Sequence, residues 1–290
     1  MRLPLTVISG YLGAGKTTLI NRLLAEDHGL RLLVMVNDFG AINIDAALIA
    51  AKGDDTIALT NGCVCCTMGA DLFLALGDAL DRDPRPDHLV IEASGIADPA
   101  AIANAAKAEP DLSYAGIVTL VDAQNATGLL SDPLIAPQVA QQMAVADLLL
   151  LTKGDLTDSL RGALAAHHLT EPQRLPAGGG LAPLLFGLTP LLRSRPANAH
   201  PAYCHWATDK VSAHSRDALW DKLAARPSDL YRLKGIVPGL DGCTEVHVVG
   251  HHVELRPVKD GTPALVGLGL ADRITPQEID RWWRGADIED

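Results

Sequence analysis

The chain has 290 residues, of which 48% are hydrophobic, and its formal net charge is −11 at pH 7. This length allows one α/β domain and a smaller second domain. The acidic balance argues against a non-specific nucleic-acid binder and against docking on an anionic membrane surface, so neither nucleic acid nor membrane is an expected partner.

The cysteines and the apolar segments indicate the cellular compartment of the protein. No apolar run reaches the roughly 20 residues of a transmembrane helix. The apolar residues 1–8 are too short for a signal peptide and are expected to form the first strand. Five cysteines in a chain of this size do not make a disulfide scaffold, and three of them lie within residues 63–66. We therefore expect a cytoplasmic protein whose thiols have a metal or redox role.

Residues 1–193 alternate between short apolar runs and helix-length segments. The expected strands are Leu3–Ile8, Leu32–Val36, Thr56–Leu59, His88–Ile91, Ile117–Val121 and Asp147–Leu151. The expected helices include Thr18–Glu26, Asp71–Leu80 and Ala136–Ala146. Continuous apolar runs are typical of parallel strands that are covered on both faces. The alternation predicts an α/β fold with a doubly wound, mostly parallel sheet that binds ligands at the carboxyl ends of its strands.

The remaining residues predict a second, different domain. Residues 194–201 hold two prolines and little periodic structure, and they are the expected linker. Residues 202–290 are expected to form a smaller C-terminal α+β domain. Its predicted elements are a helix at Ser215–Ala225, strands at Asp229–Val237, Thr244–Val249, His252–Pro257 and Ala264–Leu268, and a helix at Thr275–Trp283.

A phosphate-binding loop follows the first predicted strand. Residues 10–17 match the pattern G-x-x-x-x-G-K-[ST], with a strand before them and a helix after them, which is typical of a P-loop NTPase. The glycines let backbone N–H groups turn inward around phosphates, and the helix N-terminus adds positive charge. Lys16 is expected to contact the β- and γ-phosphates, and the Thr17 hydroxyl to ligate Mg²⁺.

The end of the sixth predicted strand indicates which base is bound. Thr152, Lys153, Gly154 and Asp155 resemble the guanine-specificity motif Asn-Lys-x-Asp, with Thr152 in place of the usual Asn. A carboxylate at Asp155 would accept hydrogen bonds from the N1–H and 2-amino groups of guanine, a donor pair that adenine lacks. The alternative is a charged loop between strand and helix.

Acidic residues follow three other predicted strands. Glu92 is placed to hold the Mg²⁺ shell, and the N–H of Gly95 to donate to the γ-phosphate. Asp38 either reaches the Mg²⁺ shell or orients water, and the alternative is a helix N-cap or an Asx-turn. Asp122 is interpreted as a helix cap. The predicted catalytic residues are therefore Lys16, Thr17, Asp38 and Glu92.

Cys63, Cys65 and Cys66 form a cluster of soft ligands that suits Zn²⁺, Co²⁺ or Cu⁺. Because a fourth ligand is missing locally, the site is expected to be open, as suits a metal that must leave again. The alternatives are buried cysteines that act as small hydrophobic residues, or a redox-sensing thiol pair. A second candidate set, His200, Cys204 and His205, lies near the linker.

These motifs together resemble the CobW-type metallochaperone GTPases, relatives of the urease and hydrogenase nickel chaperones. The matching stretches are residues 10–18, 37–40 with 43–45, 61–66, 92–99 and 152–155. The resemblance places Gly10, Gly13, Ala14, Gly15, Lys16, Thr17, Thr18, Gly95, Thr152, Lys153 and Asp155 at the nucleotide. Ala41 stands where the family usually has Glu, and the His-rich loop of many members is absent.

The resemblance implies a GTPase that delivers a transition metal, zinc or else cobalt, to a client metalloprotein. Cys63, Cys65 and Cys66 would be its ligands, Thr17 and Glu92 would serve Mg²⁺, and a nucleotide-dependent homodimer is the implied assembly. The rival hypotheses are a redox-regulated GTPase without metal cargo, a small-molecule kinase, and a GTP-switch module whose partner is not a metalloprotein.

Overall fold

The computed structural model describes residues 2–37, 56–59, 70–188, 190, 203–239, 242–249 and 252–285. These residues form two compact units, one with the described residues up to 190 and one with those from 203 onward. Each unit is built on its own sheet. The predicted linker at 194–201 lies outside the described residues, so that boundary stays a prediction.

The sheet of the first unit is parallel throughout its described pairings. Its strands are β1 Leu3–Gly10, β2 Leu32–Asn37, β3 Thr56–Leu59, β4 His88–Glu92, β5 Leu112–Asp122, β6 Leu148–Thr152 and β7 Gln173–Arg174. Their spatial order is β3-β2-β4-β1-β5-β6-β7, and each neighbouring pair is parallel. This confirms the predicted fold class of a doubly wound sheet.

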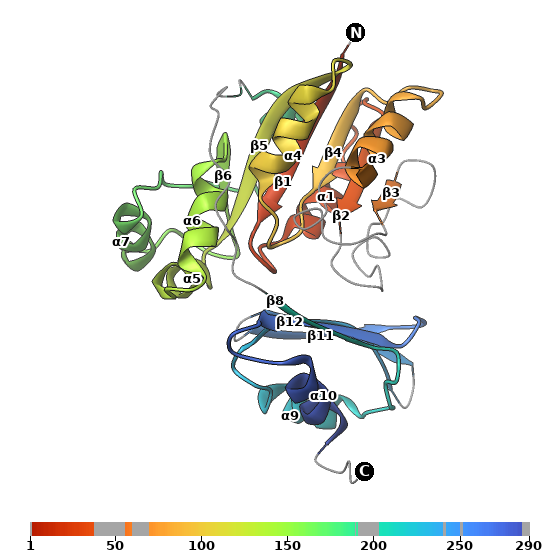
Figure 1. Cartoon of the computed structure of the whole chain (residues 1–290), viewed down its shortest axis with the longest axis vertical. Coiled ribbons are helices and arrows are strands. Elements are labelled where there is room, and N and C mark those ends of the chain that lie inside the picture. The colour runs from red at the N-terminus through yellow and green to blue at the C-terminus, as the bar shows by residue number, and fades with distance from the viewer. Residues whose placement is uncertain are drawn as a thin grey trace. The chain divides into compact units, whose positions relative to one another are not determined.

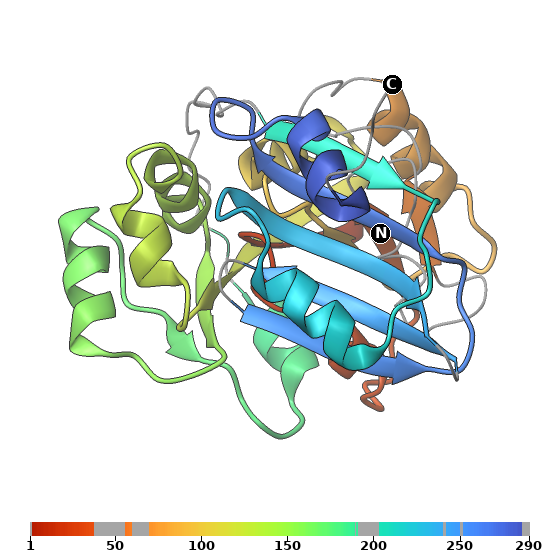
Figure 2. The same ribbon diagram turned by 90° about the horizontal axis from the view of Figure 1, so that it is seen from below.

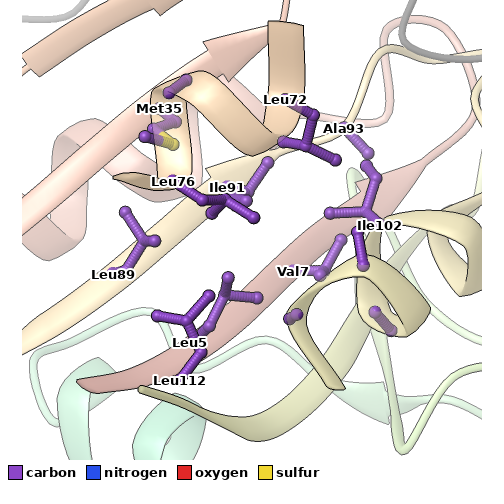
Figure 3. Packing of buried hydrophobic residues seen from close by; sticks show 14 of the residues in the cluster. Leu5, Val7, Met35, Leu72, Leu76, Leu89, Ile91, Ala93, Ile102 and Leu112 are labelled. Carbon is purple, nitrogen blue, oxygen red and sulfur yellow. The ribbon is translucent and has the colours of Figure 1, made fainter. Parts of the chain in front are cut away.

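Helices cover both faces of this sheet. They are α1 Lys16–Leu24, α3 Ala70–Leu80, α4 Pro99–Ala108, α5 Ala126–Ser131, α6 Ala136–Ala144, α7 Asp158–Ala166 and α8 Leu181–Phe186. Figure 1 shows α3 and α4 on one face of the sheet. Leu72 and Leu76 of α3 and Ile102 of α4 point toward strand residues such as Val7 and Ile91 (Figure 3). On the other face, α1 and α8 pack on a second cluster that includes Ile8 and Leu150.

The second unit is a five-stranded antiparallel sheet with two helices. Its elements are β8 Tyr203–Thr208, α9 Arg216–Ala224, β9 Leu230–Pro238, β10 Cys243–Val249, β11 His252–Val258, β12 Ala264–Leu270 and α10 Pro276–Arg284. The strand order is β11-β10-β9-β12-β8. Leu219 of α9 and Ile279 of α10 share one core with the strands. In Figure 2 both helices, α9 in cyan and α10 in dark blue, cover the same face of the sheet. The predicted α+β character is confirmed.

β5 is longer than predicted, and β8 was not predicted, each for a physical reason. β5 begins at Leu112, whereas the predicted strand began at Ile117. The prediction was too short because Ser113 and Tyr114 interrupt the apolar run, although their backbone still pairs with β1. β8 alternates between buried and more exposed residues over only six positions, which leaves too short a period-two signal. No helix in the described ranges is long and apolar enough to cross a membrane.

A buried histidine links the start of β4 to the rest of the first unit. His88 is 4% exposed, its Nε2 lies 2.9 Å from Thr6 Oγ1, and its ring stacks on Phe186 with centroids 3.9 Å apart. Burial lowers the pKa of His88 to about 4. The folded state therefore holds His88 neutral at pH values where the unfolded chain binds a proton.

This histidine predicts a stability loss in acid. Between pH 6.5 and pH 4 the unfolded chain protonates His88 and the folded protein does not, so the free energy of unfolding should fall as pH decreases, by up to about 3 kcal/mol from this residue. The variant His88→Gln should lack that part of the pH dependence. Urea unfolding followed by circular dichroism measures this pH dependence. Tryptophan fluorescence would not report on the unit that holds His88, because all four tryptophans lie in the second unit. Identical pH profiles in both proteins would contradict the assignment.

Candidate functional site

The loop between β1 and α1 has the geometry of a phosphate cradle. Gly10, Gly13 and Gly15 adopt positive φ angles of 139°, 73° and 100°, which L side chains rarely adopt. A Cβ on Gly10 would lie 2.7 Å from the carbonyl oxygen of Leu120, so the loop also packs tightly against β5. Helix α1 begins directly at Lys16, so the helix N-terminus, where backbone N–H groups have no partner within a helix, lies at the end of this loop.

Lys16 and Thr17 begin α1, whereas Thr18 in the same turn is exposed. Lys16 is 6% exposed, and its Nζ donates to the carbonyl oxygens of Gly10 at 2.8 Å and Tyr11 at 3.3 Å. The hydroxyl of Thr17 donates to Glu92 Oε1 at 3.0 Å. Glu92, which ends β4, is 4% exposed. The structure thus brings together three of the four predicted catalytic residues.

The Thr17 and Glu92 oxygens fit a magnesium ion. Mg²⁺ prefers oxygen ligands and commonly uses one or two protein groups together with phosphate oxygens and water. A hydroxyl and a carboxylate already 3.0 Å apart, at the start of a phosphate-binding helix, are such a donor set. These two residues remain our prediction for the Mg²⁺ ligands.

The base-recognition motif is tied to the phosphate loop. Thr152 Oγ1 donates to the carbonyl oxygen of Ala14 at 2.8 Å, which connects the end of β6 to the cradle. Lys153 has a φ of 60° and forms an ion pair with Asp122, Nζ to Oδ2 at 3.1 Å. The hydroxyl of Thr152 therefore bonds the loop backbone from the position where the usual motif has Asn.

Asp122 and Asp155 have different surroundings. Asp122 is buried and also accepts from Gln124 N at 3.0 Å and Asn125 Nδ2 at 2.9 Å, so it stabilises the turn before α5 and orients Lys153. The interpretation of Asp122 as a helix cap was wrong, because the N-cap of α5 is Asn125, without a side-chain cap bond. Asp155 is exposed, and its Oδ1 pairs with Arg174 at 3.1 Å. The carboxylate expected to read guanine is thus at the surface and engaged by an arginine.

The segment after β4 lies directly against the phosphate loop. A Cβ on Gly95 would lie 2.5 Å from Leu12 Cδ2 and 2.8 Å from the Cα and N of Leu12. Asp98 caps α4 by accepting from Ala100 N at 2.9 Å. From α6, buried Gln138 and Gln142 donate to carbonyl oxygens of residues 95–97. Sequence reasoning missed both amides, because an amide pair on a helix has the pattern of a solvated face.

Four predicted site residues, Asp38, Cys63, Cys65 and Cys66, lie outside the described residues. Their roles therefore stay predictions. Within the described ranges, no group of three or more His, Cys, Asp or Glu side chains is arranged to hold a metal ion.

The second candidate ligand set does not form a site at its described positions. Cys204 is buried in the core of the second unit, and burial raises the pKa of its thiol. His205 is the next residue of β8, so its side chain points to the opposite face of the sheet. His200 lies outside the described residues. Cys204 and His205 of this candidate set therefore cannot act as a ligand pair, because strand alternation separates the two side chains.

Residues 4–174, more than half of the chain, match the family model described as CobW/HypB/UreG, nucleotide-binding domain. The chain belongs to this family. Membership confirms the predicted resemblance and the GTPase class of enzyme.

Relatives include proteins named as zinc chaperones. The chain is 32% identical over 276 residues to the zinc chaperone CobW of a Sinorhizobium species, covering 81% of this chain and 78% of that one. It is 38% identical over 162 residues to the zinc chaperone YjiA of Escherichia coli, covering 53% of this chain and half of that one. A crystal structure of Zn(II)-bound YjiA GTPase from E. coli aligns with a TM-score of 0.43 and 21% identity, covering 99% of this chain and 100% of that one.

The contact between Gly95 and Leu12 predicts the effect of a single added methyl group. In Gly95→Ala the new Cβ would overlap the backbone of Leu12, so either the segment after β4 or the phosphate loop must move. We expect the affinity for a fluorescent GTP analogue to fall at least tenfold in a direct titration.

Gly162→Ala is the matched control for this variant. Gly162 lies inside α7, and a Cβ there would meet nothing within 4 Å. This change should leave nucleotide affinity within twofold and stabilise the protein by about 0.5–1 kcal/mol. Full affinity in Gly95→Ala would show that the two backbones need not touch for nucleotide binding.

Proposed function

We propose that this chain is a GTP-hydrolysing metallochaperone that binds a transition metal at Cys63, Cys65 and Cys66 and delivers it to a client metalloprotein in the cytoplasm. Zinc is the proposed cargo, with cobalt as the alternative metal. The observation that carries the proposal is a phosphate cradle in which Thr17, at the start of α1, is hydrogen-bonded to Glu92. The chain that holds this cradle belongs to the CobW/HypB/UreG family.

The described residues support the following roles in hydrolysis. Lys16 would exchange its bonds to the carbonyl oxygens of Gly10 and Tyr11 for the β- and γ-phosphates of GTP. Thr17 and Glu92 would hold Mg²⁺, which neutralises charge on the phosphates when bound. Asp38 is proposed to orient the attacking water. Gly95, beside the loop, would sense the γ-phosphate through its N–H group.

Base recognition would use the surface carboxylate of Asp155. Guanine would have to replace Arg174 as its partner, or share the carboxylate with it. Because the Asp155–Arg174 pair is exposed, it contributes little stability, and the exchange costs little. Lys153, oriented by Asp122, would lie beside the base.

Metal coupling is supported by where the cysteines stand in the chain. Residues 63–66 follow β3 and precede α3, between the segments of Asp38 and Glu92 that are proposed to respond to nucleotide. Relatives named zinc chaperone CobW, zinc chaperone YjiA and zinc-regulated GTPase metalloprotein activator 1 support zinc as the metal. GTP would favour the tightly binding geometry, and hydrolysis would release the metal to the client. A nucleotide-dependent homodimer is the proposed assembly.

The thiol cluster predicts a stoichiometric zinc site. The purified reduced chain should retain about one tightly bound Zn²⁺ after passage over a weak chelator, measured by elemental analysis. A variant with Cys63, Cys65 and Cys66 all changed to Ser should lose it, because serine is a poor ligand for zinc. The control Cys243→Ser, at a half-buried cysteine of β10, should keep the metal. No zinc in the reduced wild-type chain would favour a redox-regulated GTPase instead.

The exposed carboxylate of Asp155 predicts the basis of nucleotide choice. Asp155→Ala should reduce the ratio of GTP to ATP affinity at least tenfold, since the guanine N1–H and 2-amino groups lose their acceptor. Arg174→Ala is the control for loss of the salt bridge and should keep the preference for GTP. Competition titrations with non-hydrolysable analogues of GTP and ATP measure both effects. An unchanged preference in Asp155→Ala would place guanine recognition elsewhere.

A further inference from the structure

Two glutamines of α6 hydrogen-bond to the backbone of residues 95–97, the segment that follows β4. Gln142 Nε2 donates to the carbonyl oxygens of Gly95 at 3.1 Å and Ala97 at 3.0 Å. Gln138 Nε2 donates to the carbonyl oxygen of Ile96 at 2.6 Å. Residues 138 and 142 are one helical turn apart and therefore lie on the same face of α6. Three consecutive carbonyl groups are thus bound by one helix face.

Both amides are removed from solvent, so these hydrogen bonds have a structural effect that surface contacts lack. Gln142 is 1% exposed and Gln138 is 3% exposed. The backbone carbonyl oxygen of Gln142 accepts from Thr119 Oγ1 of β5 at 3.1 Å, which fixes the end of α6 against the sheet. A buried amide without its acceptors would carry a desolvation penalty, so the arrangement favours one conformation of residues 95–97.

The residues that flank positions 95–97, and Gln142 of α6, carry polar atoms whose hydrogen-bonding capacity is not used. Ser94 Oγ, Asp98 Oδ2 and Gln142 Oε1 are buried and lack a hydrogen-bond partner within the described part of the chain. Buried polar groups are normally satisfied, and each exception costs about 1–3 kcal/mol. The unused atoms lie at the two ends of residues 95–97 and on the Gln142 side chain, beside the backbone that the glutamines hold.

The segment of residues 95–97 also contacts the phosphate loop. Gly95 lies against the backbone of Leu12, and Gln142 lines a small cavity together with Tyr11, Leu12 and Ala14 of that loop. A planar trans peptide directs its N–H opposite to its carbonyl group. The N–H of Gly95 shares its peptide with the carbonyl of Ser94, which accepts from Ala97 N at 3.0 Å. The glutamines hold the carbonyl groups of residues 95–97, so the turn that sets the direction of the Gly95 N–H is held as well.

We propose that Gln142, assisted by Gln138, is a positioning residue that presents the Gly95 segment to the γ-phosphate. The amides hold this backbone in place before nucleotide arrives, so that triphosphate binding does not have to order it. Neither glutamine is a catalytic residue, because each acts through the backbone of residues 95–97. The inference rests on the proposed GTP-hydrolysing function and adds a determinant of how triphosphate is told from diphosphate.

The test is the isosteric variant Gln142→Met in the full chain, which removes both donated hydrogen bonds and keeps the side-chain volume. The affinity for a non-hydrolysable GTP analogue should fall at least fivefold relative to the affinity for GDP, with GDP affinity within twofold of wild type. The single-turnover rate of GTP hydrolysis should fall at least fivefold. Gln138→Met removes one such bond rather than two and should shift the same ratio by less.

Gln141→Met is the matched control, the same chemical change one residue earlier on α6, and should leave the ratio unchanged. Equal losses for analogue and GDP in Gln142→Met, or no loss for either, would overturn the proposal. If Gln142→Met does not fold, Gln138→Met tests the same ratio. Failure of the proposed function is separate: a wild-type chain that prefers ATP would refute guanine specificity, and the triphosphate-to-diphosphate ratio would then be measured with adenine nucleotides.

Discussion

The hydrogen bond from Thr17 to Glu92, 3.0 Å long, is the interaction on which the rest of the site depends. It joins the first turn of α1, which carries the phosphate cradle, to the last residue of β4, which leads into the Gly95 segment. Because the Glu92 carboxylate is buried beside Thr17, a ligand that binds both oxygens contacts both elements at once. A magnesium ion and a triphosphate are ligands of this kind.

Around that bond, the phosphate loop is contacted from two other directions. The base motif reaches it through Thr152 and the carbonyl oxygen of Ala14, and the Gly95 segment reaches it through Leu12. Parallel strands bring these pieces together, since the loops after β1, β4 and β6 all follow the carboxyl ends of neighbouring strands. In the proposed function, changes at the γ-phosphate would be passed to the chain on either side of Glu92, and the proposed metal ligands precede Glu92 in sequence.

The sequence was sufficient where local chemistry decides the structure. Leu32–Val36 and His88–Ile91 are buried on both faces, so a plain apolar run predicted β2 and β4 to within a residue or two. The cradle was predictable because only one spacing of glycines, lysine and threonine makes it. Contacts between distant elements were not predictable. Asp155 pairs with Arg174, and Gln142 bonds residues about 45 positions away, and neither local composition nor periodicity encodes such partners.

The central claim, that nucleotide and metal bind in a coupled way, is tested most directly by zinc competition against a chromophoric chelator. The titration is made once with Mg²⁺ and a non-hydrolysable GTP analogue and once with Mg²⁺ and GDP. Coupled binding predicts zinc affinity at least tenfold tighter with the triphosphate, a coupling of at least about 1.4 kcal/mol, and an equal tightening of the analogue relative to GDP by zinc. Equal zinc affinities in the two nucleotide states would show that nucleotide and metal bind independently.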